Sequence, residues 1–111
     1  MKTKILSLVV LFLMCTMSLL AQSKTIKLKV YGNCSMCEKT IEKAAQSVEG
    51  VKSADWNKET KIMEVSFDQK KTDVTKIHLA IVKAGYDTDK HKAKTTDYKG
   101  LPGCCQYDRP E

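Results

Sequence analysis

Residues 30–38 read VYGNCSMCE, and this stretch decides the fold. It follows a strand-like run and precedes a helix-like run, so Cys34 and Cys37 are expected to share one exposed turn at the start of a helix. Thiolates in that position are stabilised by the helix dipole and by free backbone N–H groups. The spacing predicts either a clamp for a soft metal ion or a redox dithiol, and the rest of the chain favours the clamp.

Apolar residues recur with the period of a strand before this stretch and with the period of a helix after it. Residues 24–31 alternate between apolar and polar side chains, which is typical of a half-buried strand. Residues 35–48 predict a helix, with Ser35 and Glu38 as a capping box and Gly50 placed just beyond its end. The apolar stripe of this helix consists of Ile41, Ala44, Ala45 and Val48.

Four further elements follow in the second half of the chain. They are strands over residues 51–57 and 61–67, a helix over residues 72–84 and a polar edge strand over residues 88–94. The second helix is expected to be capped by Thr72 or Asp73 and to end at Gly85. This order predicts an α+β fold, a ferredoxin-like βαββαβ sandwich with two helices on one face of a four-stranded antiparallel sheet.

The N-terminus has the layout of a secretory signal peptide, predicted for residues 1–21. Lys2 and Lys4 form its basic region, the next sixteen residues are almost wholly apolar, and Ala21 ends a cleavage site. The apolar run is short for a membrane span, so we expect export without stable membrane insertion once the signal is removed. An uncleaved anchor is the alternative. The chain would then divide into a folded domain, residues 24–94, and a tail, residues 95–111.

Net charge argues against nucleic acid as a partner. The formal charge is +6, but the lysines are scattered, Arg109 is the only arginine and aromatic residues are sparse. Nucleic-acid-binding domains instead gather basic residues into one patch or stripe. The modest positive charge fits an acidic protein partner.

Four cysteines remain after the predicted signal peptide, and they form two tight pairs at opposite ends of the chain: Cys34 with Cys37, and Cys104 with Cys105. This spacing is unlike a disulfide framework that staples loops. The tail lacks periodicity and is expected to be a loop, which can span about 30 Å between Lys94 and Cys104. Three hypotheses therefore remain for Cys104 and Cys105: they are auxiliary metal ligands, they form a vicinal disulfide, or they have no role.

A longer array of residues carries a resemblance to a known family. It comprises Gly32-x-Cys34-x-x-Cys37, Ile41, Ala44, Ala45, Glu49-Gly50-Val51 and Ala80-Ile81-x-x-Ala84-Gly85-Tyr86. In this order, residues 25–94 resemble the heavy-metal-associated domain family, which includes copper chaperones, domains of copper-transporting ATPases and exported mercury-binding proteins. The resemblance implies that Cys34 and Cys37 ligate a metal ion and that Tyr86 lies near it. With the signal peptide, it implies an exported protein of the bacterial periplasm.

The loop departs from the family pattern at two positions, because Tyr31 and Gly32 stand where the common loop has Gly and then Met. The common loop has Met two residues before the first cysteine, and that methionine anchors the loop in the core. Here Gly32 occupies the position and Tyr31 precedes it. Glycine cannot supply the anchor, so Tyr31 is the candidate for that role.

Thiolate sulfur selects soft ions, so we expect Cu(I) first, Hg(II) next, and Zn(II) or Cd(II) if four cysteines form the site. The chain is expected not to be an enzyme. It would capture the ion and buffer it, or pass it to a membrane metal transporter or another metal-binding protein by ligand exchange. The alternatives are a thiol-disulfide oxidoreductase using the same pair, a zinc- or cadmium-binding four-cysteine protein, and a purely structural domain.

Met36 is expected to point outward, Met63 inward, and His78 and His91 to lie on the surface.

Overall fold

The computed structural model describes residues 23–110, so the signal peptide predicted for residues 1–21 lies outside the described part. In chain order the elements are β1 (Ser23–Lys29), α2 (Ser35–Gln46), β2 (Val51–Trp56), β3 (Ile62–Asp68), α3 (Val74–Lys83), α4 (Thr95–Lys99) and a 3-10 helix, η1 (Gly103–Cys105). Up to α3, this is the order of strands and helices that the periodicity predicts.

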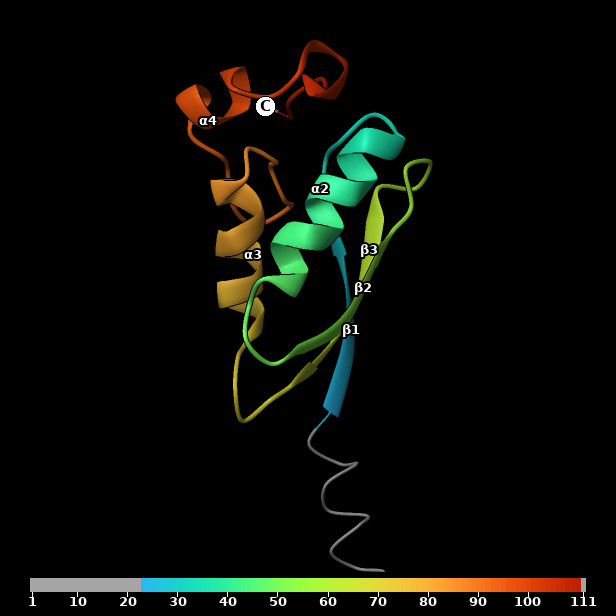
Figure 1. Ribbon diagram of the computed structural model, residues 1–111, viewed down its shortest axis with the longest axis vertical. Helices are drawn as coiled ribbons and strands as arrows, with labels where there is room; N and C mark the ends of the chain where they lie inside the picture. The colour runs from blue at the N-terminus through green and yellow to red at the C-terminus, as the bar shows by residue number, and fades with distance from the viewer. Residues whose placement is uncertain (1–22, 111) are drawn as a thin grey trace, which may run out of the picture.

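The strands form one antiparallel sheet in the order β1-β3-β2, and α2 and α3 lie side by side along one face of it (Figure 1). The central strand β3 turns Met63, Val65 and Phe67 toward the helices, and all three are buried, as the alternation predicts. From β2, Ala54 and Trp56 join the same core, again as expected. The core therefore sits between the sheet and the two helices.

The fourth strand expected over residues 88–94 is absent from the described residues. Only an isolated bridge between Val30 and Thr88 continues the sheet on that side. The reason is local hydrogen bonding, because the Thr88 amide donates to the His91 carbonyl at 2.9 Å and the Ala93 amide donates to the Asp87 carboxylate at 2.7 Å. Backbone groups engaged in this way cannot extend a ladder along β1, and the segment folds back after one bridge.

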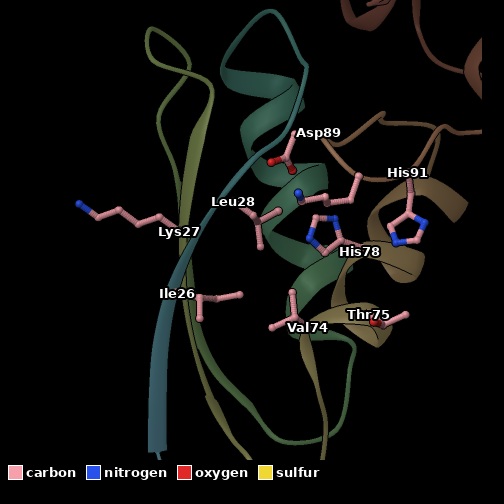
Figure 2. A pocket seen from close by; sticks show the side chains of 9 residues that line it. Ile26, Lys27, Leu28, Val74, Thr75, His78, Asp89 and His91 are labelled. Carbon is pink, nitrogen blue, oxygen red and sulfur yellow. The ribbon is translucent and has the colours of Figure 1, made fainter.

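His78 was expected on the surface, and the structure buries it instead. Its Nδ1 lies 2.7 Å from the Thr88 hydroxyl, and its ring centroid lies 5.3 Å from that of His91. Both residues line a pocket between β1, α3 and the 89–91 turn (Figure 2). Burial is the main reason that the pKa of His78 is lowered, so this ring packs as a neutral group. His91 is half-buried.

The helix starts agree with prediction at α3 and differ at α2. Asp73 caps α3 by accepting the Lys76 amide at 2.9 Å, as expected. The Ser35–Glu38 capping box is wrong, because Cys34 is the N-cap of α2 and no side chain bonds to the free amides there. Those amides are therefore left facing the cysteine loop.

Trp56 fills the space beneath this loop. Its ring is 1% exposed, and its Nε1–H donates to the Val30 carbonyl at 2.9 Å. A Cβ at Gly32 would lie 3.0 Å from both the Trp56 ring and the Ile41 Cδ1, so glycine lets the loop lie directly on the indole. Trp56, rather than Tyr31, thus occupies the core under the position that methionine holds in the common loop. Tyr31 is only half-buried.

The tail is more ordered than the loop that the sequence predicts. It contains α4 and η1 and lies across the end of the molecule that carries the start of α2 (Figure 1). Gly85, which ends α3 as expected with φ of +106°, permits the close approach of α4, since a Cβ there would lie 2.9 Å from the Asp97 carbonyl. Cys105 and Tyr107 are buried in the main core.

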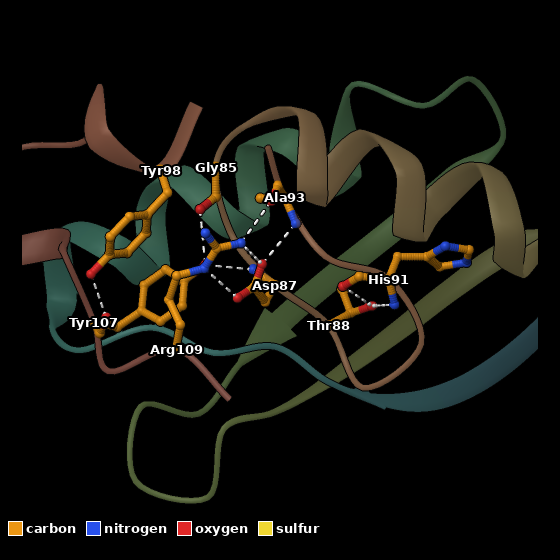
Figure 3. A network of polar contacts seen from close by, with 8 residues as sticks. All are labelled: Gly85, Asp87, Thr88, His91, Ala93, Tyr98, Tyr107 and Arg109. Atoms are coloured by element: carbon orange, nitrogen blue, oxygen red, sulfur yellow. Dashed lines mark hydrogen bonds and ion pairs between the residues drawn. The ribbon is translucent and has the colours of Figure 1, made fainter. Parts of the chain in front are cut away.

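A polar clasp holds the end of the tail, and we define it as Asp87, Tyr98, Tyr107 and Arg109 (Figure 3). The Arg109 guanidinium donates to both carboxylate oxygens of Asp87 at 2.8 Å and to the Ala93 carbonyl at 2.6 Å. The Tyr107 hydroxyl accepts the Asp87 amide at 2.7 Å and donates to the Gly85 carbonyl at 2.9 Å. The Tyr98 hydroxyl donates to the Tyr107 carbonyl at 2.6 Å. Every one of these bonds is between tail and domain or within the tail, so the clasp fixes residues 104–109 against the loop after α3.

Candidate functional site

Cys34 and Cys37 lie together at the start of α2, as their spacing predicts. Cys34 is the N-cap and is half-buried, whereas Cys37 sits in the first turn and is buried. Their Sγ atoms are 3.6 Å apart, far beyond the ~2.05 Å of a disulfide, and both thiols are free. The pair thus has one sulfur accessible from solvent and one supported by the core.

The tail brings a second pair of sulfurs to the same place. The Sγ atoms of Cys34, Cys104 and Cys105 all lie within 4.8 Å of one another, and those of Cys104 and Cys105 are 3.9 Å apart. Direct contacts secure this arrangement, since Asn33 Nδ2 donates to the Cys104 carbonyl at 3.4 Å and the Cys104 thiol lies 3.7 Å from Met36 Sδ. Met36 is 53% exposed, so it points outward as expected.

The thiols of Cys34 and Cys105 differ in acidity. The backbone N–H of Cys37, followed by the Cys37 thiol, lowers the pKa of Cys34 to about 7. Burial, followed by the Cys37 thiol, raises the pKa of Cys105 to about 12. The helix N-terminus accounts for the first effect, because its free amides and positive dipole end favour a thiolate. Near neutral pH the metal-free site therefore holds its negative charge on Cys34, with Cys105 protonated.

This asymmetry predicts the order of alkylation in the metal-free, reduced protein. Because a lowered pKa raises the thiolate population at a given pH, the alkylation rate of Cys34 should rise through a midpoint near pH 7. Cys105 should remain nearly unreactive over the same range, because its thiol deprotonates only near pH 12. Peptide mapping by mass spectrometry after timed iodoacetamide treatment at several pH values measures both rates. Equal rates for Cys34 and Cys105 would contradict the assignment.

Tyr86 neighbours the thiols of Cys37 and Cys105. Its side chain is fully buried, and its hydroxyl has no hydrogen-bond partner among residues 23–110. Burial raises the pKa of Tyr86, and the neighbouring thiols of Cys105 and Cys37 raise it further. The hydroxyl therefore keeps its proton and is a donor that faces sulfur.

Sequence reasoning missed the residues that hold the tail, above all Asp87 and Arg109. No periodic pattern links them, since they are 22 residues apart and neither belongs to a helix or strand. One signal was present: Arg109 is the only arginine in a chain whose other basic residues are lysines. Arginine is the residue that pairs bidentately with a buried carboxylate, which is what the structure shows.

Within residues 23–110, none of the helices has the length and apolar character that crossing a membrane requires.

Comparison of the sequence with known proteins identifies metal-binding relatives that align with the part of the chain that carries Cys34 and Cys37. The model of the heavy-metal-associated domain matches residues 33–87, which include Cys34 and Cys37 but not the tail cysteines. The mercuric transport protein periplasmic component of Shewanella putrefaciens is 40% identical over 84 residues, or 75% of this chain and 92% of that protein. The component of the same name from Pseudomonas aeruginosa is 43% identical over 67 residues, or 60% and 74% of the two chains.

Solved structures give the same result for the fold. Oxidised MerP from Ralstonia metallidurans CH34 superposes with a TM-score of 0.58 and 41% identity, covering 60% of this chain and 94% of that one. The CopZ metallochaperone gives a TM-score of 0.57 and 35% identity, covering 59% of this chain and 98% of that one. The sandwich of two helices on an antiparallel sheet is thus shared with both structures.

Proposed function

Since the chain belongs to the heavy-metal-associated domain family, we propose that it is a non-enzymatic binding protein that carries one soft metal ion on Cys34 and Cys37. The observation that supports this most directly is the pair of free thiols, 3.6 Å apart, at the N-terminus of α2. Thiolate sulfur is soft and polarisable and selects thiophilic ions over hard cations. A Cys34 thiol already half ionised near neutral pH would bind such an ion with little cost of deprotonation.

Hg(II) and Cu(I) are the two ions we propose, with Hg(II) first. From the sequence alone Cu(I) stands first, but several relatives that align over most of their length are named for mercuric transport. The similarity to a metallochaperone and to copper-binding ATPase domains keeps Cu(I) as the second ion. Both ions are thiophilic and suit a site made of cysteine sulfurs.

We further propose that the protein works in the bacterial periplasm and hands its ion to a membrane metal transporter or another metal-binding protein. The relatives' names include the periplasm, and residues 1–21 are predicted to be a signal peptide. Transfer would proceed by ligand exchange, in which a partner thiolate displaces Cys34, the more exposed of the two ligands. Lys39, exposed one turn after the site, and Lys43 would steer an acidic partner.

An Hg(II) titration of the reduced protein against a competing small thiol tests the proposal. We expect binding of one ion, weakened by more than about 100-fold in Cys34→Ser, because losing a ligand costs more than the 10–100-fold loss typical of outer-shell changes. Ser35→Ala is the matched control, since Ser35 neighbours the site, is exposed and makes no cap contact. Tight binding retained in Cys34→Ser would overturn the proposal. Metal-independent reduction of a disulfide substrate, lost in Cys34→Ser, would instead support an oxidoreductase.

A further inference from the structure

We propose that Cys104 and Cys105 are metal ligands too, so that the C-terminal tail closes a site of at least three thiolates over the Cys34–Cys37 loop. This inference rests on the proposed function, since it adds ligands to the same ion. It also assigns a task to the tail, residues 95–110, which lies beyond the part of the chain that matches the family model. The task is to enclose the ion until a partner's thiolates replace the tail.

The sulfur positions allow one ion to bind three thiolates, because the Sγ atoms of Cys34, Cys104 and Cys105 lie within 4.8 Å of one another, a group that does not include Cys37. Two sulfurs on opposite sides of one ion are about 4.6 Å apart when each metal–sulfur bond is about 2.3 Å, whereas tetrahedral ligands are about 3.8 Å apart. The Cys34–Cys37 and Cys104–Cys105 separations are 3.6 Å and 3.9 Å, close to the tetrahedral value. Cys34 bridges the two pairs, because its sulfur lies within 4.8 Å of both tail sulfurs.

The clasp explains how a terminal segment presents ligands at a defined place. Arg109 and Tyr107 bind the loop directly after α3, at Asp87 and Gly85, and thereby pin the chain two to four residues beyond Cys105 (Figure 3). On the other side of the pair, α4 packs against Gly85. With both flanks fixed, little conformational entropy remains for the tail to lose when its sulfurs bind an ion.

The Tyr86 hydroxyl is a second, independent observation that points to a bound ion. A fully buried hydroxyl without a partner costs free energy, and Tyr86 has no partner among the described residues. Cys37 and Cys105 are the groups that face it. An ionised sulfur accepts a hydrogen bond more strongly than a neutral thiol does, and metal binding ionises the thiol. A thiolate of the closed site would thus satisfy Tyr86.

The most exposed sulfur of the set indicates how the closed site opens. Cys104 is exposed, whereas Cys105 and Cys37 are buried and Cys34 is half-buried. An incoming thiolate reaches Cys104 first, so exchange starts at the tail and proceeds toward the loop. The ion then remains bound by at least two sulfurs at each step.

X-ray absorption spectroscopy of the Hg(II)-loaded full chain counts the sulfur ligands. We expect about three or four sulfurs in the wild type and about two in Cys104→Ser/Cys105→Ser, with a shorter mean mercury–sulfur distance in the variant, since each bond shortens when fewer ligands share the ion. The single variant Cys104→Ser, at an exposed position, should lose one sulfur without disturbing the core. Asp108→Ser is the matched control, because it alters an exposed position of the same segment and removes no sulfur.

Hydrogen exchange shows whether a variant has lost only a sulfur ligand or has also lost the docking of its tail. The Asp87 amide is bonded to the Tyr107 hydroxyl, so its hydrogen exchange in the metal-free variants reports whether the clasp is closed. We expect Cys104→Ser to keep wild-type protection there while losing one sulfur. Two sulfurs in the wild type, or an unchanged count in both serine variants, would overturn the inference and leave the proposed function intact. Failure of the wild type to bind Hg(II) at all would refute the proposed function itself.

Discussion

Trp56→Ala should lower the free energy of unfolding by about 3–5 kcal/mol, the range for removing a buried aromatic side chain. The indole is 1% exposed and packs against Gly32, whose missing side chain leaves no other group to fill the space. The substitution also leaves the Val30 carbonyl without its donor. Since a small domain has a total stability of only about 5–15 kcal/mol, this loss would be a large fraction of it. Urea denaturation of the reduced, metal-free protein measures the change.

Trp56→Phe is the matched variant for this prediction. Phenylalanine keeps an aromatic ring beneath the loop but lacks the N–H that donates to Val30, so we expect a smaller loss of about 1–3 kcal/mol. A cost below about 1 kcal/mol for Trp56→Ala would show that the loop can collapse onto the core without the indole. The metal affinity of either variant should fall with its stability, because the indole supports the residue two before Cys34.

Arg109→Gln should destabilise the protein by about 2–4 kcal/mol, somewhat below the usual cost of removing one partner of a fully buried ion pair. Asp87 is fully buried whereas Arg109 is 24% exposed, so solvent reduces the effect in part. Without the guanidinium, the Asp87 carboxylate would stay in the core with only the Ala93 amide as a donor. The Asp87 amide should also exchange faster, because the clasp opens. Urea denaturation and hydrogen exchange by NMR measure these two effects.

The pH dependence of this difference has a defined sign. Burial raises the pKa of Asp87, but the Arg109 guanidinium and the Ala93 amide outweigh burial and hold the pKa below its ordinary value of 3.8. A depressed carboxyl pKa adds stability that is complete above the unfolded value and is lost as the pH falls through the folded value. The gap between wild type and Arg109→Gln should therefore be full at neutral pH and close in acid below about pH 4. Lys99→Gln removes the same charge from an exposed site in the tail and should change stability by less than about 0.5 kcal/mol.

Local patterns predicted most of the sandwich, and the exceptions share a cause. Helices α2 and α3, the three strands of the sheet, the Asp73 cap and the stop at Gly85 follow from periods and residue types within a few neighbouring positions. The fourth strand failed because Asp87 and Thr88 bond to backbone groups three to six residues ahead. His78 was misplaced because Thr88 and His91 cover it from a neighbouring segment.

By itself, the sequence determined the order of elements from β1 to α3, the family and the placing of Cys34 and Cys37 on one helical turn. These depend on spacing along the chain, which a helix or strand converts directly into position. Only the tertiary structure decided where the tail goes, because Cys34 and Cys104 are 70 residues apart and no local period relates them. Their meeting depends on a glycine that admits α4 and on an arginine that finds Asp87. Such contacts form only when several segments that are distant in the sequence pack together. The periodicity of the sequence does not predict that packing.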